Sequence, residues 1–493
     1  MSPTRRAPLP LVIIAASLPM FMAMLDNLVV TNALPALAQD LDASIEQLQW
    51  FINAYSLSFA SFILMAVALG DRMGRRRIFT AGIALFTLAS IACALAGSPT
   101  ELIIARAVQG AGAAALLPLS LAILASNVTP RQRPLAIGVW GGISGLGVAL
   151  GPVIGGAVVE GMTWHAIFWL NVPVGIIAIP LVRYALAESR GERAPLDVPG
   201  LLLGMSGVFA LVFGIIRGNE AGWTSPQVLA GLVGGTVLTA TFIAWERRAS
   251  APLLPLGLFR DRSFSVANAV GLLFSLGMFG SVFILIQYLQ VVQGHSPLEA
   301  GVMTMPWTMA PLIVAPITGF ITPRVGTRTP IVAGLASQAV GLAWIATVMD
   351  VSTPYVQFVP AFILCGVGMG LVFAPSATAV LAHMREVDHA KASGTNSTVR
   401  EIGVALGIAI LTAVFTGTGG DFTPTGYTDS AVIAVYVGAA ILALTTAIGT
   451  MLPPLRARGE AGLSTGPGAG AKESGAGAQE QPGVPTHVPA MRS

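Results

Sequence analysis

Residues 46–77 read EQLQWFINAYSLSFASFILMAVALGDRMGRRR, an apolar run that ends in a cluster of positive charge. The run over 46–69 is long enough for a helix that crosses a bilayer, which needs roughly 20 apolar residues. Arginines then gather between Arg72 and Arg77, and positive charge accumulates on the cytoplasmic side of membrane proteins. This stretch therefore predicts one transmembrane helix and the side of the membrane on which it ends.

The composition of the whole chain is that of a protein solvated by lipid. Of its 493 residues 54% are hydrophobic and 10% are charged, whereas soluble globular proteins carry about 25% charged residues. The net charge of +3 is explained by where the arginines lie along the chain, so nucleic acid is not implied as a partner. Cys93 and Cys365 each lie inside an apolar run, which predicts neither a disulfide framework nor a thiolate metal site.

Apolar stretches of spanning length recur along the chain and predict fourteen membrane spans. They lie near 11–33, 46–69, 78–97, 101–126, 134–160, 165–186, 198–217, 227–245, 264–291, 299–322, 330–349, 355–382, 394–416 and 430–452. The first also resembles a signal peptide, because Arg5 and Arg6 precede it and residues 36–38 resemble a cleavage site. Asp26 and Asn27 interrupt this run where a signal peptide stays apolar, so we expect a span.

The distribution of arginine and lysine tests this count independently. These residues occupy alternate connections between the spans: Arg5 and Arg6, Arg72 to Arg77, Arg131 and Arg133, Arg183 to Arg193, Arg247 to Arg262, Arg324 and Arg328, Arg385 and Lys391, and Arg456 and Arg458. The other connections hold almost no positive charge, Arg217 excepted. The alternation predicts an even number of spans with both termini in the cytoplasm. A count of twelve would require that the two apolar stretches over 198–245 do not cross the membrane.

A short internal repeat predicts how the spans are grouped. Residues 71–76, after the second span, resemble residues 323–328, after the tenth. Many secondary transporters consist of two repeated halves with the substrate site between them near mid-membrane. We therefore expect an all-α integral membrane protein in which two six-helix bundles are related by pseudo-symmetry and two helices are inserted between them. The predicted parts are a cytoplasmic N-terminus at 1–10, a bundle at 11–190, a linker with the inserted helices at 191–250, a second bundle at 251–452 and a disordered, Gly- and Pro-rich cytoplasmic tail at 453–493.

The connection after the second span contains more than a positive anchor requires. Its residues of interest are Asp71, Arg72, Gly74, Arg75 and Arg76. Asp71 is an acid among arginines, and Gly74 permits a tight turn between two antiparallel helices. We interpret the loop as a determinant of topology and also as a gate, whose charges pair with the facing half in one conformation and separate in the other.

The fifth span is unusually rich in glycine. Gly147, Gly151 and Gly155 recur every fourth residue and form a stripe that lets another helix approach closely, and Gly138 extends the pattern. Pro152 removes a backbone hydrogen bond in mid-span and favours a bend. Simple packing explains the stripe alone, whereas the stripe together with the bend indicates a helix on which the two halves pivot.

Ionisable groups inside the bilayer are costly and usually functional. Asp26 lies about seven residues below the outer end of its span and Arg106 about five below the outer end of its own, so the two lie at similar depth. They are either a static structural pair or a site where a small rearrangement changes the protonation of Asp26. Arg400 and Glu401 lie nearer the cytoplasmic end of their span, where an inner gate, a local ion pair and a proton site remain alternatives.

Polar and aromatic residues on the spans are candidates for a substrate cavity. They are Asn32, Trp50, Asn53, Tyr55, Gln287, Gln290, Trp307 and Asn396. Met303, Met305 and Met309 are further candidates, although a methionine on a span usually serves packing. No residue pattern names a ligand.

Two other kinds of site are not expected. His383, Glu386, Asp388 and His389 superficially resemble metal ligands, but they fall in a solvated loop beside Arg385 and Lys391, and we predict no metal. The chain also lacks a Gly-rich phosphate loop that ends in Gly-Lys-Ser or Gly-Lys-Thr, which argues against a pump driven by ATP.

Several of these segments together resemble the major facilitator superfamily, and within it the drug:proton antiporter family with fourteen spans. The resemblance covers residues 10 to about 452, and the segments that carry it are Leu25 to Pro35, Gly70 to Arg77, Arg106 with Gln109 to Gly112, Gly138 to Gly156, Trp164 with Ile167 to Gly175, Ser296 to Gly301 and Ser393 to Arg400. Two positions depart from the family pattern. Val67 replaces a glycine before the second connection, and Glu401 stands where glutamine is common.

The resemblance implies export of drugs, antibiotics or natural products in exchange for protons, with Asp26 as the proton-coupling acid and Arg106 as its partner. The proton gradient is then the energy source, and no cofactor is needed. We expect a multi-pass protein of the cell membrane that acts as a monomer among membrane lipids. An importer of the same fold is the alternative that the glycines of the fifth span disfavour. A polytopic enzyme or sensor is disfavoured too, because no cluster of His, Asp or Glu lies at one membrane face.

Overall fold

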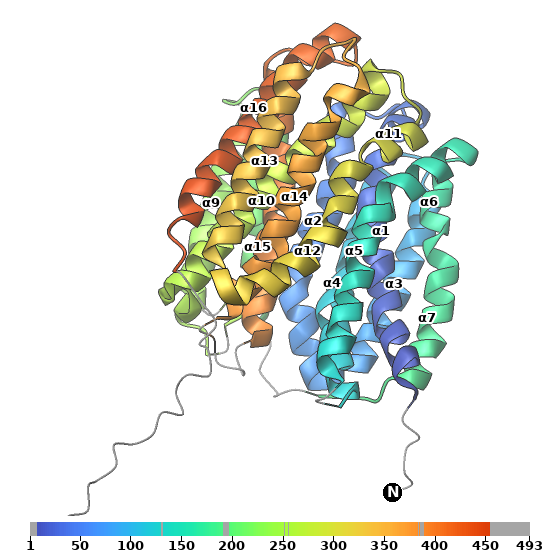
Figure 1. Ribbon diagram of the computed structural model, residues 1–493, viewed down its shortest axis with the longest axis vertical. Coiled ribbons are helices and arrows are strands. Elements are labelled where there is room, and N and C mark those ends of the chain that lie inside the picture. The colour runs from blue at the N-terminus through green and yellow to red at the C-terminus, as the bar shows by residue number, and fades with distance from the viewer. Residues whose placement is uncertain are drawn as a thin grey trace, which may run out of the picture. The chain divides into compact units, whose positions relative to one another are not determined.

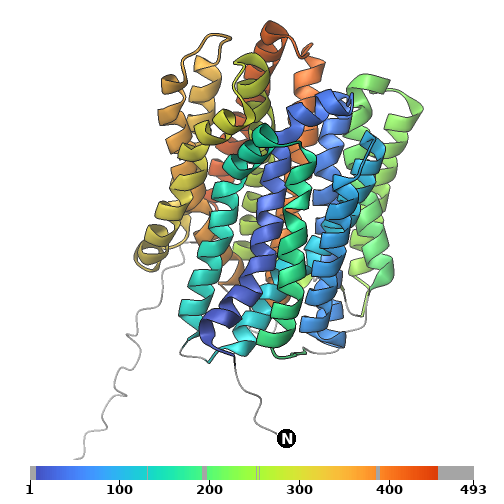
Figure 2. The ribbon, with the colours of Figure 1, turned by 90° about the vertical axis from the view of Figure 1, so that its right-hand side faces the viewer.

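The computed structural model describes residues 7–129, 132–190, 197–250, 252–254, 256–382, 384 and 389–453. Among these residues every regular element is helical, and Figures 1 and 2 show long helices that lie side by side. The predicted all-α membrane protein is confirmed. The tail predicted at 453–493 lies outside the described residues except for Pro453.

The helices follow one another in the order of the predicted spans. The α-helices are α1 (Leu9–Asp40), α2 (Ile45–Met73), α3 (Arg75–Ala94), α4 (Pro99–Asn127), α5 (Arg133–Gly161), α6 (His165–Trp169), α7 (Asn171–Ala185), α8 (Val198–Ala221), α9 (Pro226–Glu246), α10 (Arg262–Gln287), α11 (Pro297–Met303), α12 (Met305–Val325), α13 (Arg328–Val348), α14 (Val359–Leu381), α15 (His389–Gly417) and α16 (Pro424–Gly449). Three short helices of other types are η1 (Leu256–Arg260), η2 (Tyr288–Val292) and η3 (Tyr355–Gln357).

The described residues contain 12 helices that are long and apolar enough to cross a membrane, or up to 13 if the bent pair Ile45–Ile63 and Met65–Met73 forms one span. The chain is therefore a multi-pass membrane protein. The fifth predicted span coincides with α5, a helix of 29 residues. The count of 12 does not include it, because only its part Leu150–Gly161 is recognised as apolar and that part is shorter than a span. The count of fourteen stays a prediction.

Three predicted spans are not a single α-helix from end to end. The sixth consists of α6 and α7, which meet at Leu170, and the ninth continues from α10 into the π-helix η2. The tenth breaks at Thr304 between α11 and α12. There the Thr304 hydroxyl donates to the Gly301 carbonyl at 2.8 Å, and Pro306 sits in the first turn of α12, where its lack of an N–H matters least.

Local sequence explains where many helices begin. Ser44 and Gln47 form a capping box at the start of α2, and Ser296 and Glu299 form another at the start of α11. Each pair satisfies backbone N–H groups that have no partner within the helix. Asp261 caps α10 by accepting a hydrogen bond from the Phe264 N–H at 2.8 Å.

The packing falls into two groups of helices. Helix α1 packs on α4, α5 and α7, and α4 packs on α2 and α3; Figure 2 shows the dark-blue α1 between α5 and α7. In the second group α10 packs on α15 and α16, while α14 packs on α12 and α13. The groups meet where α5 contacts α11 and α12 and where α2 contacts α15. The predicted part boundaries and the pseudo-symmetry stay predictions.

The helices α8 and α9 pack on each other, and α8 also contacts α2 and α15. Their ends are tied together by Asp197, whose carboxylate caps α8 at the Gly200 N–H at 2.9 Å and accepts from the Trp245 indole at 2.8 Å. Next to Trp245, the Glu246 carboxylate accepts from the Leu254 N–H at 3.1 Å. These bonds fix the helix pair where the chain enters and leaves it.

Candidate functional site

The structure brings Asp26 of α1 against Arg106 of α4. The Arg106 Nη1 atom lies 2.5 Å from Asp26 Oδ2, and the exposed fractions of the two residues are 3% for Asp26 and 0% for Arg106. Two unit charges so far from water are maintained only when they are paired and hydrogen-bonded. The pair is therefore a costly feature with well-defined geometry inside the α1–α7 group.

Amide side chains complete the coordination of Asp26. Its Oδ1 atom accepts from Gln109 Nε2 at 2.9 Å and from Asn171 Nδ2 at 2.7 Å. Gln109 also accepts from Arg106 Nη1 at 2.6 Å, and both amides donate to the Ser90 hydroxyl. Both oxygens of the carboxylate thus face N–H donors. We call Asp26, Ser90, Arg106, Gln109 and Asn171 the acid network.

The guanidinium of Arg106 is held from a third side by α2. Its Nε donates to the Phe51 carbonyl at 3.0 Å, and the Tyr55 ring centroid lies 4.3 Å from its central carbon. The Nη2 atom is buried without a hydrogen-bond partner among the described residues. Unsatisfied donors on a buried cation are unfavourable, and the two N–H groups of this nitrogen are left for a partner in another conformation.

Sequence reasoning missed four members of this site. No sequence pattern pointed to Ser90 or Phe51. Gln109 and Asn171 belong to segments that resemble the family, but no role was predicted for either residue. The sequence does contain one pattern that could have identified Gln109. Arg106 and Gln109 are three residues apart and so share one face of α4. Asn171 is the first residue of α7, next to the break after α6, and from there its side chain reaches Asp26 of α1.

A second polar contact joins α1 to the other group of helices. The Asn32 amide donates to the Pro152 carbonyl of α5 and to the Pro297 carbonyl of α11, both at 2.8 Å. Gln290 of η2 in turn donates to the Asn32 carbonyl at 2.9 Å and to its side-chain oxygen at 3.0 Å. One asparagine therefore ties together segments from both groups.

The helices α5 and α11 meet at this point through two glycines. A Cβ atom at Gly156 would collide with the Pro297 carbonyl, and a Cβ at Gly301 would collide with the Pro152 carbonyl. The contact is reciprocal, since each helix places a glycine on the other helix's proline carbonyl. We call Asn32, Pro152, Gly156, Pro297 and Gly301 the Asn32 junction.

The glycine stripe of α5 faces α1. Added Cβ atoms would lie 3.2 Å from Met24 Cβ at Gly147, 2.7 Å from Leu28 Cβ at Gly151 and 2.9 Å from Val29 Cα at Gly155. Gly138 lies in α5 too, with its surroundings outside the described residues. The stripe thus sets a close contact between α1 and α5, and its role as a pivot stays a prediction.

The basic connection forms its contacts within the first group of helices. Arg75 Nε lies 2.7 Å from Asp71 Oδ1, and Gly74 has the positive φ of 118° that favours glycine. Glu188, which the sequence analysis did not single out, follows α7 and accepts from the Arg76 N–H at 2.9 Å. Arg72 is exposed. Pairing of this loop with the facing half stays a prediction.

Arg400 and Glu401 point to different surroundings on α15. The Arg400 guanidinium lies 4.3 Å from the Phe373 ring centroid, in a cation–π contact. Glu401 Oε2 is buried without a hydrogen-bond partner among the described residues. No ion pair between Arg400 and Glu401 is found in the part of the chain that the structure describes. Their roles as a gate or proton site stay predictions.

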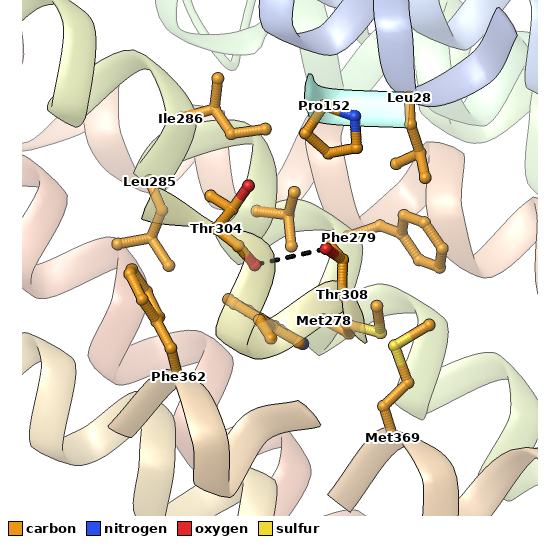
Figure 3. Close-up of a pocket in the computed structure, with 12 residues that line it drawn as sticks. Leu28, Pro152, Met278, Phe279, Leu285, Ile286, Thr304, Thr308, Phe362 and Met369 are labelled. Carbon is orange, nitrogen blue, oxygen red and sulfur yellow. Dashed lines mark hydrogen bonds between the residues drawn. The ribbon is translucent and has the colours of Figure 1, made fainter. Parts of the chain in front are cut away.

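An apolar pocket lies where α1 and α5 face α10, α12 and α14. Figure 3 shows Leu28 and Pro152 at one edge and Phe362 and Met369 at the opposite edge. The residues that line it are Leu28, Pro152, Met278, Phe279, Val282, Leu285, Ile286, Thr304, Trp307, Thr308, Phe362 and Met369. Among the predicted cavity residues, Trp307 lines this pocket.

The other predicted cavity residues have different neighbours. Trp50 packs on Phe209 at a ring-centroid distance of 5.5 Å, and Tyr55 lies on Arg106. Gln287 donates to the Phe283 carbonyl at 3.0 Å. The amides of Asn32 and Gln290 belong to the junction region, Asn396 donates to Asn268 at 3.2 Å, and the buried Asn53 side chain has no partner among the described residues. Substrate contact by these residues stays a prediction.

The predicted absence of a metal site also stays a prediction. His383, Glu386 and Asp388 lie outside the described residues, as does the side chain of His389. Elsewhere in the described ranges no group of three His, Cys, Asp or Glu side chains is placed to hold a metal ion.

Comparison with known proteins places the chain among membrane transporters. The sequence pattern of the Major Facilitator Superfamily matches residues 16–408. The multidrug resistance protein Stp of Mycobacterium tuberculosis is 38% identical over 82% of this chain and 75% of its own length. The puromycin resistance protein pur8 of Streptomyces alboniger is 36% identical over 90% of this chain and 88% of its own. The tetracenomycin C resistance and export protein of Streptomyces glaucescens is 33% identical over 85% and 78%.

Solved structures show the same fold at low sequence identity. A bacterial homologue of the human lysosomal transporter Spinster, in an inward-facing and unoccupied conformation, gives a TM-score of 0.64 at 16% identity over 90% of this chain and 96% of its own. The human organic anion transporter MFSD10 gives 0.62 at 14% identity over 90% of this chain and 100% of its own.

Proposed function

The chain belongs to the major facilitator superfamily, and from that premise we propose that this membrane transporter exports hydrophobic small molecules, drugs or antibiotics among them, in exchange for protons. Relatives over most of its length are named for resistance to, or export of, such compounds. These names support export as the direction of transport and disfavour a solute importer of the same fold.

The acid network is the observation that carries proton coupling. Asp26 is the carboxylate at its centre, and three N–H donors from α4 and α7 reach it. A movement that withdraws Arg106 or Asn171 would leave a buried charge without partners, and proton uptake removes that cost. Protonation and conformation are then linked, which is what exchange of a proton for a substrate requires.

We assign the start of α1 to the cytoplasmic side of the cell membrane, with both termini on that side. The supporting argument is the alternation of basic connections along the chain. In this orientation the Asn32 junction lies toward the outside, so the described conformation is closed there. The substrate then reaches the pocket from the cytoplasm and leaves when the junction opens.

The proposed architecture has fourteen spans. It adds α5 to the 12 or 13 helices that are long and apolar enough to cross a membrane. Its 29 residues, Arg133–Gly161, exceed the roughly 20 that a bilayer requires. The helices α8 and α9 are then an inserted pair between two six-span halves. The transporter functions as a monomer whose partners are the exported compound, protons and membrane lipid, without a cofactor.

The Asp71–Arg76 loop is the proposed gate on the cytoplasmic side. Its present ion pairs are local, between Arg75 and Asp71 and between Arg76 and Glu188. These pairs are only half-buried, and ion pairs near the protein surface are weak, of order 0–1 kcal/mol, so they can exchange partners during transport at little cost.

Replacing Asp26 with asparagine tests the coupling. Inverted membrane vesicles that contain Asp26→Asn should lose proton-driven uptake of the exported compound while the protein is still inserted at normal amounts. Asp429→Asn, the same change at an exposed position of α16, is the matched control and should retain transport. Undiminished transport by Asp26→Asn would remove Asp26 from the coupling mechanism.

A further inference from the structure

The pocket between α1 and the second group of helices has an unusual chemical character. Among the described residues, its lining contains no Asp, Glu, Lys, Arg or His side chain. A charged ligand that entered it would lose its hydration without gaining a countercharge, which is strongly unfavourable. The pocket therefore selects against ions by desolvation.

The acid network does not supply the missing countercharge. Leu28 lines the pocket, and Asp26 lies two residues earlier on the same helix, about 200° around its axis. The Asp26 carboxylate is turned toward α4 and α7, where Arg106 neutralises it. Helix α1 thus separates the charged interior of its own group from the apolar pocket.

The polar atoms that line the pocket are limited. The Thr304 hydroxyl donates to the Gly301 carbonyl at 2.8 Å, and the Thr308 hydroxyl lies 3.4 Å from the Thr304 carbonyl, the contact drawn in Figure 3. Both hydroxyl protons are directed at backbone oxygens of their own helical segment. The threonines consequently leave the pocket little donor capacity.

Trp307 differs from these threonines because its hydrogen-bond donor is unpaired within the described part of the chain. Its side chain lines the pocket and its residue is 3% exposed, yet the indole Nε1 has no hydrogen-bond acceptor among the described residues. Buried donors are nearly always paired, because an unpaired N–H in apolar surroundings is costly. An acceptor atom on a bound molecule would satisfy it.

The remaining lining is apolar and partly aromatic, which suits flat, apolar molecules. Phe279 and Phe362 offer aromatic surfaces, and Met278 and Met369 offer flexible thioethers that adapt to different shapes.

We propose that this pocket binds uncharged aromatic compounds through an oxygen acceptor that takes the hydrogen bond of Trp307 Nε1, and that it rejects permanent cations. The proposal rests on the proposed export function and names the class of substrate that the same transporter carries. Specificity arises from one buried donor in an otherwise apolar lining, because an analogue without the acceptor leaves that donor unpaired.

Two dyes with one ring system test this choice. Nile red is uncharged and ends in a carbonyl oxygen, whereas Nile blue carries a cationic iminium group in its place. Energised cells with and without the gene are loaded with either dye, and its efflux is followed by fluorescence. Nile red should leave at least about tenfold faster than Nile blue, each rate corrected for cells without the gene, a ratio that corresponds to 1.4 kcal/mol.

Two variants connect that selectivity to the pocket. Trp307→Phe keeps the ring and removes the N–H, and it should slow Nile red efflux about tenfold. Trp344→Phe, the same change at an exposed position of α13, is the control and should leave efflux unchanged. Thr308→Asp places a carboxylate in the lining and should reverse the preference in favour of Nile blue.

The outcomes separate the two proposals. Export of Nile blue as fast as Nile red, or unchanged Nile red efflux in a normally inserted Trp307→Phe protein, would overturn the pocket assignment and leave export itself standing. The second result is also expected if the indole binds only a water molecule. Export of neither dye would contradict both proposals, since the pocket's ligand class includes Nile red.

Discussion

The acid network and the pocket lie against one helix yet have opposite chemistry. Within the acid network, Asp26 and Arg106 are charged, buried and bonded to each other and to amide side chains, which in turn donate to the Ser90 hydroxyl. At the pocket, Leu28 faces aromatic and thioether side chains with no charge among them. The difference indicates that the proton and the exported compound occupy separate sites, and that α1 links them.

This separation restricts how coupling can occur. A cation bound directly to Asp26 would compete with the proton, but a neutral compound in the pocket touches neither Asp26 nor Arg106. The compound and the proton instead influence each other through the position of α1, which contacts α4, α7, α10 and α11. Changes in the acid network should therefore alter energy coupling, and changes in the pocket should alter selectivity.

The largest effect is expected for Arg106→Ala. Removing one partner of a buried pair leaves the Asp26 carboxylate uncompensated, which destabilises by about 3–5 kcal/mol. Proton-driven efflux should fall to the level of cells without the gene, and the purified protein should unfold at a lower temperature in detergent. Arg247→Ala, at an exposed arginine outside both the acid network and the proposed gate, serves as the control. Wild-type efflux by Arg106→Ala would reduce the pair to packing.

The next effect concerns the junction that connects α5 with α11. Gly156→Ala adds a methyl group that collides with the Pro297 carbonyl, so the closed junction should be disfavoured and efflux reduced. Spin labels at Met162→Cys and Val302→Cys, both at exposed positions near the junction, should report a larger separation by pulsed EPR.

A matched control exists on the same helix. Gly161→Ala places its methyl group in open space and should leave the label distance and efflux unchanged. An unaltered distance distribution in Gly156→Ala would mean that the glycine contact does not hold the junction closed.

A smaller effect is expected for Asn32→Ala. This change removes three hydrogen bonds, to the Pro152 and Pro297 carbonyls and from the Gln290 amide, each worth about 0.5–1.5 kcal/mol. The same label pair should show a partial shift toward the longer distance, with slower efflux and unchanged preference between the two dyes. A change in dye preference would instead place Asn32 at the substrate.

Sequence patterns predicted the fold because membrane insertion leaves few alternatives. Backbone groups in a bilayer must bond within a helix, so apolar runs and basic connections give the spans and their order. The breaks at Leu170 and Thr304 were not predicted, because neighbouring helices and side chains stabilise them. The contact of Arg76 with Glu188 was missed for the same reason, since nothing local links two residues so far apart in sequence.

The candidate site was predictable in part. The position of Asp26 and Arg106 at similar depth followed from counting residues along two helices, whereas the amides that complete the network depend on which faces meet. Polar residues such as Tyr55 and Gln287 were predicted to line a cavity, yet polar groups in a membrane preferentially find partners within the protein. The pocket is lined mainly by apolar residues that sequence alone does not distinguish from ordinary packing.

Binding of Nile red to purified Asp26→Asn protein tests the separation of the two sites most directly. Nile red anisotropy is titrated against wild-type, Asp26→Asn and Trp307→Phe proteins in lipid nanodiscs, and proton-driven efflux is measured for the same variants in cells. The account predicts that Asp26→Asn binds the dye within about twofold of wild type, a difference below 1 kcal/mol, while its efflux is lost. Loss of binding in Asp26→Asn, to the level of Trp307→Phe, would contradict it.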